Sequence, residues 1–201
     1  MTEKKRSRNF TGKELRLNLY ITQLLVLLIS TILAWLLFDN PQDVLALFVW
    51  DPIPIMIIGG GAAACIVMLD YVAIKLFPES WFDDGGINER VFYGIGIFHL
   101  ACLTLLIGFA EEFLFRGIVQ TQFGFWVASL TFAVLHVRYM RKPFLFTFVL
   151  VISMFLGCLF ELTGNLFITV FAHFLTDFMM GLHLRKGADN KEDEYWSDRV
   201  E

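Results

Sequence analysis

Long apolar blocks separated by short polar connections dominate the chain. Residues 19–38 contain no charged side chain, and similar blocks follow it along the sequence. An uncharged apolar run of about 18 or more residues is typical of a transmembrane helix, because it can cross the hydrocarbon core of a bilayer. The pattern predicts six spans, at 19–38, 53–76, 91–122, 124–138, 143–162 and 165–184. We therefore expect an all-α, polytopic helical membrane protein embedded in the lipid bilayer.

Composition supports this class over a soluble domain. Apolar residues make up 57% of the chain, charged residues only 18%, and the mean hydropathy is +0.63, whereas soluble domains carry about 25% charged residues. The first apolar block is longer than the apolar region of a signal peptide and has no clear cleavage site, so we expect it to be retained. The small residues at 59–64 indicate close helix packing rather than a nucleotide-binding loop. No basic stripe typical of nucleic-acid binding occurs, so no nucleic-acid partner is expected.

Polar segments flank the membrane-embedded part, residues 19–184. Residues 1–18 form a basic N-terminal segment, and residues 185–201 form a charged tail that we expect to be disordered. Six spans would place both termini on one side. The Lys and Arg residues at 1–18, 138–142 and 185–186 would then share that side, which the positive-inside rule makes cytoplasmic. The sequence thus predicts a multi-pass protein of the cell membrane with both termini in the cytoplasm.

The third block carries two acidic residues and one basic residue, Glu111, Glu112 and Arg116. A charged side chain at the bilayer centre costs about 2.5–3.5 kcal/mol on insertion scales, so such residues usually pair or line a cavity. Glu112 and Arg116 are four residues apart and share a helix face, which favours an ion pair. Glu111 points about 140° away from Arg116 by helix geometry. It is left without a local cation, which suits a general acid or base.

Two later spans contain further ionisable groups. If the chain turns near Gln122–Gly124, an antiparallel pair of helices would bring His136 to the depth of Glu111. His173 reaches a similar level on the last span, with Asp177 one helical turn further on. Phe132 precedes His136 by one turn and can pack on its ring. Structural roles are expected for the other ionisable residues in the spans, Asp70, Lys75, His99 and His183.

These groups would form one polar pocket within the membrane, with two chemical uses. They can activate water and stabilise an oxyanion, or bind a divalent metal through His136, His173 and a carboxylate. Neither an HExxH motif nor a GxSxG motif is present. One detail concerns depth. If the third span begins at Val91, Glu111 lies toward the far side of the membrane, and either a tilted helix or an early turn outside the membrane would bring it level with His136.

Three short motifs resemble those of the CPBP family, the CAAX proteases and bacteriocin-processing (Abi) enzymes. Residues 111–117, "EEFLFRG", resemble its EExxxR motif; residues 132–136, "FAVLH", its FxxxH motif; and residues 173–177, "HFLTD", its HxxxN or HxxxD motif. The resemblance implies that residues 19–184 form an intramembrane endopeptidase that cleaves a membrane protein or peptide. It also implies roles by position: Glu111 and His136 activate the attacking water, His173 and Asp177 stabilise the oxyanion, and Glu112, Arg116 and Phe132 support the site.

One departure affects the implied chemistry. Asp177 stands where the eukaryotic prenyl-protein proteases carry Asn, and an ionised Asp cannot donate a hydrogen bond to an oxyanion. Asp177 would have to be protonated, orient His173, or help to bind a metal. Although the family is often described as metalloproteases, a metal-free route is equally compatible with these residues. The expected cofactor is therefore none or a divalent metal such as zinc, with Glu111, His136 and His173 as candidate ligands.

Other functions remain open at this point. Bacterial members of the family are linked to peptide maturation, bacteriocin self-immunity and cleavage of membrane proteins. The alternative to an enzyme is a non-enzymatic bacteriocin-immunity or scaffold protein that keeps the motif residues for structure. A proton or ion carrier that uses the buried carboxylates is a further possibility.

Overall fold

The computed structural model describes residues 10–197, and their side chains up to Arg185. The described chain is helical, with no strand in it. Five helical stretches within it are long and apolar enough to cross a membrane: Gly12–Leu37, Pro52–Leu76, Ile97–Phe123, Pro143–Thr163 and Leu166–Arg185. The predicted class, a polytopic helical membrane protein, is confirmed.

Several of these stretches contain more than one helical element. The long helices are α1 (Gly12–Leu37), α4 (Gly60–Leu76), α6 (Ile97–Glu112), α9 (Pro143–Thr163) and α10 (Leu166–Ser197). The shorter helices are α2 (Pro41–Leu45), α3 (Pro52–Pro54), α5 (Ile87–Phe92), α7 (Thr121–Phe123) and α8 (Phe125–Leu135). Two π-helical segments, η1 (Ile55–Gly59) and η3 (Phe113–Gln120), and two 3₁₀ turns, η2 (Glu79–Trp81) and η4 (Val137–Tyr139), complete the order.

The fourth predicted span, at 124–138, is shorter in the structure. It corresponds to α8, whose 11 residues extend about 16 Å at standard rise. The hydrocarbon core of a bilayer is about 30 Å thick, so α8 reaches only part of the way across. The other five predicted spans correspond to the five long helical stretches. The turn considered near Gln122–Gly124 is present. Gly124 in this turn and Gly164 after α9 have positive φ angles of 87° and 58°, which glycine adopts readily.

Helix ends also differ from the sequence prediction. α1 begins at Gly12, inside the segment 1–18, because Thr11 and Glu14 form a capping box that satisfies free backbone N–H groups. At the other end of the chain, α10 continues to Ser197. It thus extends into the segment 185–201, for which the sequence analysis expected disorder. Residues 1–9 and 198–201 lie outside the described part of the chain.

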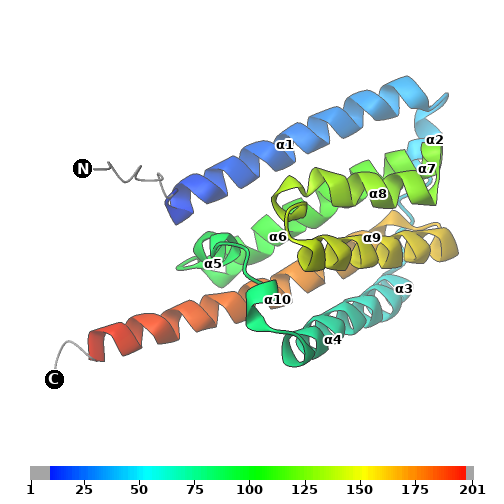
Figure 1. Cartoon of the computed structure of the whole chain (residues 1–201). Coiled ribbons are helices and arrows are strands. Elements are labelled where there is room, and N and C mark those ends of the chain that lie inside the picture. The colour runs from blue at the N-terminus through cyan, green and yellow to red at the C-terminus, as the bar shows by residue number, and fades with distance from the viewer. Residues whose placement is uncertain (1–9, 198–201) are drawn as a thin grey trace.

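Both ends of the described chain lie at one end of the bundle. The start of α1 and the end of α10 are on the same side in Figure 1, because the short helix α8 reverses the chain direction even though it does not cross fully. The described connections at this end carry Arg90, Arg138, Arg141 and Lys142, whereas those at the opposite end, residues 38–51 and 164–165, have no Lys or Arg.

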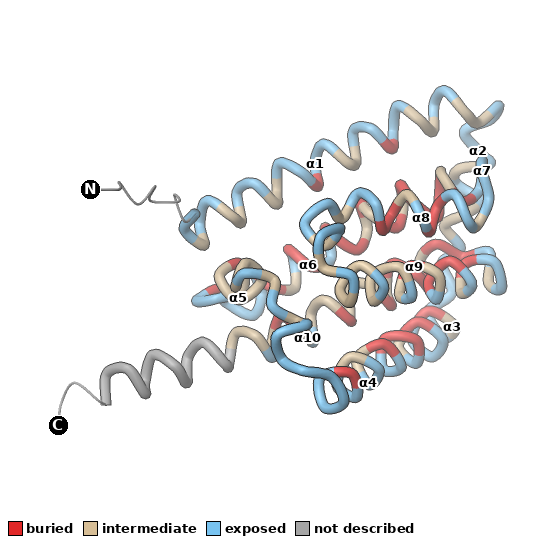
Figure 2. Tube along the Cα trace, in the orientation of Figure 1, coloured by how far each residue is buried: buried red, intermediate tan, exposed pale blue. Residues whose placement is uncertain are grey.

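Burial follows the pattern of a protein surrounded by lipid. Large apolar side chains such as Trp35, Phe98 and Leu162 are exposed, whereas charged and amide side chains such as Arg116, Glu112 and Gln120 are buried. A soluble protein shows the opposite preference. Polar groups are tolerated inside a bilayer when they are turned toward the interior of the helix bundle. Figure 2 shows buried positions concentrated on the inner helices, while α1 is mostly exposed.

α10 is the central helix of the arrangement. It packs most extensively on α6 and also contacts α4, α5 and α9. Figure 1 shows α1 and α4 on opposite sides of the bundle, with α6, α8, α9 and α10 between them. The segments that carry the three motifs, α6 with η3, α8 and α10, are therefore inner elements of the fold.

The start of α6 also bears on how far Glu111 and His136 lie from the turn that joins their helices. The third crossing helix begins at Ile97 rather than Val91, because a non-helical connection separates α5 from α6. Glu111 precedes the end of α7 by about 18 Å, and His136 follows the start of α8 by about 16 Å at standard rise. The early turn considered in the sequence analysis is therefore present, and the two residues lie at a similar distance from the turn that joins their helices.

Close approach of α6 and α10 depends on Gly108. A Cβ atom at this position would lie 2.9 Å from the backbone nitrogen of Phe174, which cannot move without shifting α10. We expect Gly108→Ala to destabilise the protein by about 1–3 kcal/mol, as overpacking usually does, measured by thermal unfolding in detergent. Gly61→Ala is the matched control, since a Cβ there meets nothing within 4 Å. Equal stability of the two variants would contradict this account of the interface.

Candidate active site

A buried ion pair forms the base of the polar site. Arg116 Nε lies 3.3 Å from Glu112 Oε2, and both side chains are almost completely buried. The second guanidinium nitrogen, Nη2, donates to the backbone carbonyl of Ser153 at 2.9 Å, which ties η3 to α9. The guanidinium group also lies over the ring of Phe132, 5.0 Å from its centroid. The ion pair expected from the four-residue spacing is thus present, and through Arg116 it links α6 and η3 to α9 and α8.

The helix changes geometry within the first motif. Glu112 is the last residue of α6, and Arg116 lies in the π-helical segment η3. π-helical turns, with hydrogen bonds from residue i to i+5, are rare and occur frequently at functional sites. The sequence analysis expected a regular helix here. The wider turn changes the direction of the side chains between Phe113 and Gln120 relative to those of α6.

Glu111 has different surroundings from Glu112. Its Oε1 accepts a hydrogen bond from Gln23 Nε2 at 2.9 Å, and its Oε2 lies 4.0 Å from His173 Nε2. The Glu111 side chain is 15% exposed, whereas that of Glu112 is 0% exposed. The two neighbouring glutamates therefore have different environments. Glu112 is buried with its partners, and Glu111 is accessible and has one oxygen without a hydrogen bond from any described residue.

His173 connects the carboxylates. Its Nδ1 lies 2.9 Å from Glu112 Oε1 and donates to that oxygen, since a carboxylate only accepts. Its Nε2 faces Glu111 at 4.0 Å and Asp177 Oδ2 at 3.6 Å. Asp177 follows one turn later on α10 and approaches the same nitrogen as Glu111. One imidazole ring thus contacts Glu112 on one side and the two more accessible acids on the other.

His136 lies at the end of α8 and reaches the site beside Phe132. Its Nδ1 is 2.8 Å from the backbone carbonyl of Phe132 and donates to it, which leaves Nε2 as a lone-pair acceptor. The Phe132 ring contacts both histidines, with centroids 4.5 Å from His136 and 6.4 Å from His173. His136 also interacts electrostatically with Asp177. Phe132 therefore separates and orients the two imidazole rings.

The sequence analysis missed one residue of this site, Gln23 on α1. It is buried, 3% exposed, and binds Glu111 directly. Its only signal in the sequence was an amide side chain in the middle of the first apolar block. That signal was not sufficient to find it, because nothing in the sequence brings the first and third spans together.

Two comparisons with known proteins bear on the family. The profile described as type II CAAX prenyl endopeptidase, Rce1-like, matches residues 94–179. The uncharacterized protein YpbD of Bacillus subtilis (strain 168) is 42% identical over 183 residues, which cover 89% of this chain and 96% of the relative. The chain belongs to the Rce1-like family of CAAX endopeptidases. No solved structure matches the chain.

The Rce1-like match contains the whole set of motif residues. It begins before α6 and ends within α10, so it includes Glu111, His136, His173 and Asp177 but not α1 or α4. This membership makes the chain a membrane protease of the CPBP kind, as the three motifs indicated.

The candidate metal ligands do not converge as a metal site requires. Within the described residues, no group of three or more His, Cys, Asp or Glu side chains is arranged to hold a metal ion. His173 Nδ1 is engaged by Glu112, and its Nε2 is 4.0 Å from Glu111. The arrangement of Glu111, His136 and His173 in this Rce1-like chain therefore does not fit a zinc centre, and we assign no chemical step to a metal.

Other ionisable residues of the spans lie away from this site. Lys75 Nζ lies over the Tyr71 ring, 4.9 Å from its centroid, and no ion pair joins Lys75 to Asp70 among the described residues. Asp70 instead interacts electrostatically with His183 on α10. These groups lie near the end of the bundle that carries the basic connections, outside the motif site.

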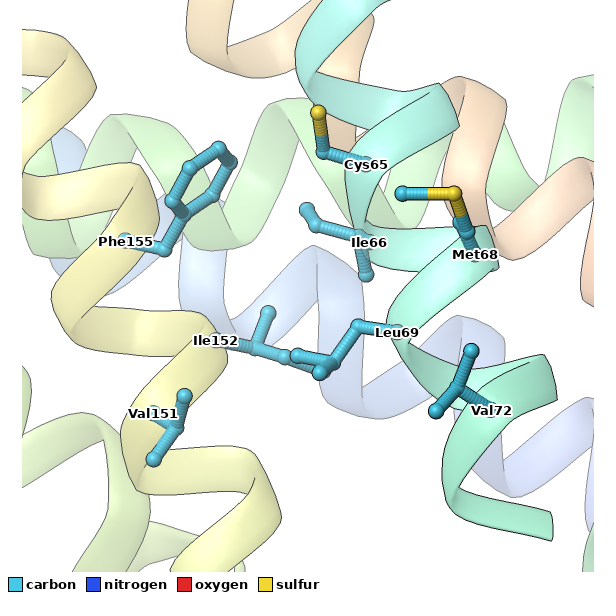
Figure 3. A pocket seen from close by; sticks show the side chains of 8 residues that line it. All are labelled: Cys65, Ile66, Met68, Leu69, Val72, Val151, Ile152 and Phe155. Atoms are coloured by element: carbon cyan, nitrogen blue, oxygen red, sulfur yellow. The ribbon is translucent and has the colours of Figure 1, made fainter. Parts of the chain in front are cut away.

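Apolar grooves of this Rce1-like chain are also separate from the polar site. One groove of about 330 Å³ lies between α4 and α9 (Figure 3). Its lining is entirely apolar or sulfur-containing: Cys65, Ile66, Met68, Leu69, Val72, Val151, Ile152 and Phe155. A second, of about 450 Å³, lies between α4 and α10. Neither lining includes an Asp, Glu, His, Lys or Arg.

Proposed function

We propose that this protein is an intramembrane endopeptidase that hydrolyses a peptide bond in a membrane-associated protein or peptide. Membership of the Rce1-like family supports the class of reaction. The observation that carries the assignment of roles is the position of Glu111, which is partly exposed and lies between Gln23 and His173. A carboxylate held in this way, with one oxygen lacking a hydrogen bond, is suited to accept a proton from water.

The reaction begins with a water molecule between Glu111 and His136. Glu111 accepts one proton of the water as its oxygen bonds to the scissile carbonyl carbon, and His136 Nε2 accepts the second proton when the C–N bond later breaks. The resulting tetrahedral intermediate carries a negative oxygen. Transfer of the proton from Glu111 to the amide nitrogen then allows the C–N bond to break, which gives a carboxylate and an amine.

His173 is the proposed oxyanion donor. In its doubly protonated form both ring nitrogens donate: Nδ1 to Glu112, and Nε2 to the oxygen of the intermediate. Asp177, 3.6 Å from Nε2, holds the ring in orientation before substrate arrives. With this assignment Asp177 itself need not donate a hydrogen bond to the oxyanion. Of the three roles considered from the sequence (a protonated donor, orientation of His173, or metal binding), the proposal gives it the orientation of His173. A preorganised donor of this type is worth about 10²–10³ in turnover rate.

Glu112, Arg116 and Phe132 support these groups without touching substrate. The Glu112–Arg116 pair fixes His173 through Nδ1, and Phe132 fixes His136 through its backbone carbonyl and its ring. In this account no residue is required to bind a metal.

The proposed orientation follows from charge. Arg90, Arg138, Arg141 and Lys142 lie at the end of the bundle where α1 begins, and the positive-inside rule places that end in the cytoplasm. Both termini would then be cytoplasmic, and the cell membrane is the proposed location.

A cleavage assay on purified protein in proteoliposomes tests the function. Two substrates are compared, a prenylated peptide ending in a CAAX sequence and an unprenylated transmembrane peptide, with products identified by mass spectrometry. We expect wild-type protein to cleave at least one of them and His136→Ala to lower the rate about 10²–10⁴-fold. His183→Ala, at an exposed position on α10, is the matched control and should cleave normally.

The same assay separates the enzyme from the alternative. A bacteriocin-immunity or scaffold protein would show no cleavage by wild-type protein, and His136→Ala would leave its protective or assembly function intact. Wild-type cleavage that persists in His136→Ala would show that His136 is not part of the chemistry.

A further inference from the structure

We propose that Gln23 of α1 positions the reaction, holding Glu111 through its amide nitrogen and orienting the attacking water through its amide oxygen. α1 lies outside residues 94–179, the part of the chain that the family profile matches. The inference rests on the proposed function, because it assumes that Glu111 is the base.

The first observation is the contact with Glu111. Gln23 Nε2 lies 2.9 Å from Glu111 Oε1, and the side chain of His173 approaches Oε2. An amide N–H donates, and a carboxylate accepts. α1 donates a hydrogen bond to one oxygen of the carboxylate, and α10 approaches the other oxygen at 4.0 Å without a hydrogen bond, so Gln23 supplies the hydrogen bond that orients it. Glu111 lies in α6, between these two helices.

The second observation is the other atom of the amide. Gln23 Oε1 is buried and has no hydrogen-bond partner among the residues that the structure describes. A buried amide oxygen without a partner is unfavourable, and more so within a bilayer, where bulk water is absent. If Gln23 served only to attach α1 to α6, its amide nitrogen would be sufficient, and its unpaired amide oxygen would lower the stability of the fold. The free acceptor can take a hydrogen bond from a donor that is present during the reaction.

Water is the donor that this geometry fits. The two polar atoms of an amide share one carbon, so Oε1 lies close to the carboxylate that Nε2 binds. A water molecule that donates one O–H to Glu111 can donate the other to Gln23 Oε1. Its lone pair is then directed at the scissile carbonyl carbon, and a misplacement of about 1 Å in such geometry can reduce the rate about 100-fold.

The third observation is how α1 is held in place. Arg16 donates to the carbonyl of Val91 at 2.9 Å, and the Tyr20 hydroxyl lies 2.8 Å from His99 Nε2. Arg16, Tyr20 and Gln23 are spaced four and three residues apart and so share one helix face. The first two anchor α1 near the basic end of the bundle. Of the three residues on this helix face, Gln23 is the one that contacts the active site.

The test compares Gln23→Leu with a control on the same helix. Gln23 and Ser30 are the two buried residues of α1, and Ser30 bonds only to the carbonyl of Val26 within α1. We expect Gln23→Leu to lower kcat about 100-fold with KM nearly unchanged, because substrate binding does not depend on the base. Gln23→Asn, which keeps both amide atoms on a shorter stem, should recover part of kcat. Ser30→Ala should retain wild-type kcat.

Each outcome is decisive when kcat is expressed per folded molecule. Wild-type kcat in Gln23→Leu would overturn the inference, while loss of activity in Glu111→Gln would leave the proposed function standing. The inference would also be overturned if Gln23→Leu changed only KM, or if Gln23→Leu and Gln23→Asn had equal kcat. Either result would show that Gln23 serves only in packing. If Gln23→Leu does not fold, kcat of the Asn variant decides: a value equal to wild type overturns the proposal. Cleavage by Glu111→Gln would instead overturn the proposed function itself.

Discussion

Glu111→Gln should abolish peptide hydrolysis while leaving the protein folded. The amide has nearly the same volume and can still meet Gln23 and His173, but it cannot take a proton from water. Loss of a general base typically lowers the rate about 10²–10⁴-fold. The measurement is kcat in proteoliposomes, together with thermal unfolding to show that the variant is as stable as wild type.

The neighbouring residue provides a demanding comparison. Glu112→Gln makes the same chemical change one position later, yet we expect it to lower stability as well as activity, because Glu112 is completely buried and pairs with Arg116. Glu79→Gln, at an exposed position in the η2 turn, should change neither. The assignment of the base would be wrong if Glu111→Gln cleaved at the wild-type rate.

Arg116→Met should have the largest effect on stability. Removing the guanidinium group leaves the Glu112 carboxylate buried without its cation and breaks the hydrogen bonds to Ser153 on α9. Breaking a buried ion pair on one side costs about 3–5 kcal/mol, a large fraction of the stability of a typical domain. The expected result is a strong fall in folded yield and in the midpoint of unfolding by denaturing detergent.

A double variant distinguishes charge from packing. Glu112→Gln combined with Arg116→Met removes both charges, so no unpaired ion remains, and it should be more stable than Arg116→Met alone. Arg141→Met, at an exposed position between α8 and α9, is the control for removal of an arginine. If Arg116→Met were as stable as wild type, the ion pair could not be the structural base of the site.

Much of the site follows from local spacing along the sequence. Pairs four residues apart, such as Glu112 with Arg116 and His173 with Asp177, share a helix face in almost any helix, and the structure places each pair in contact. The register of Glu111 and His136 could be inferred because a tight turn joins their helices. Such arguments use only the rise of a helix and the position of a turn.

Other features depend on contacts between distant segments and had no local signal. The π-helical segment η3 and the short helix α8 both interrupt runs that are apolar enough to suggest regular spans. Apolar composition reports that a segment avoids water, but it does not report its hydrogen-bonding pattern or where it turns. The expected metal ligands are a similar case, since the sequence supplies suitable residue types but not the distances between their atoms.

The sequence by itself determined the class of this protein, the approximate spans, the three motifs and the pairing of Glu112, rather than Glu111, with Arg116. These properties follow from composition and helix periodicity, which act over a few residues. Only the tertiary structure decided that His173 joins Glu112 to Glu111 and Asp177, and that Gln23 reaches Glu111 from a separate helix. Helix packing decides such contacts, because the neighbours of a helix in a bundle depend on how all of its faces fit together at once.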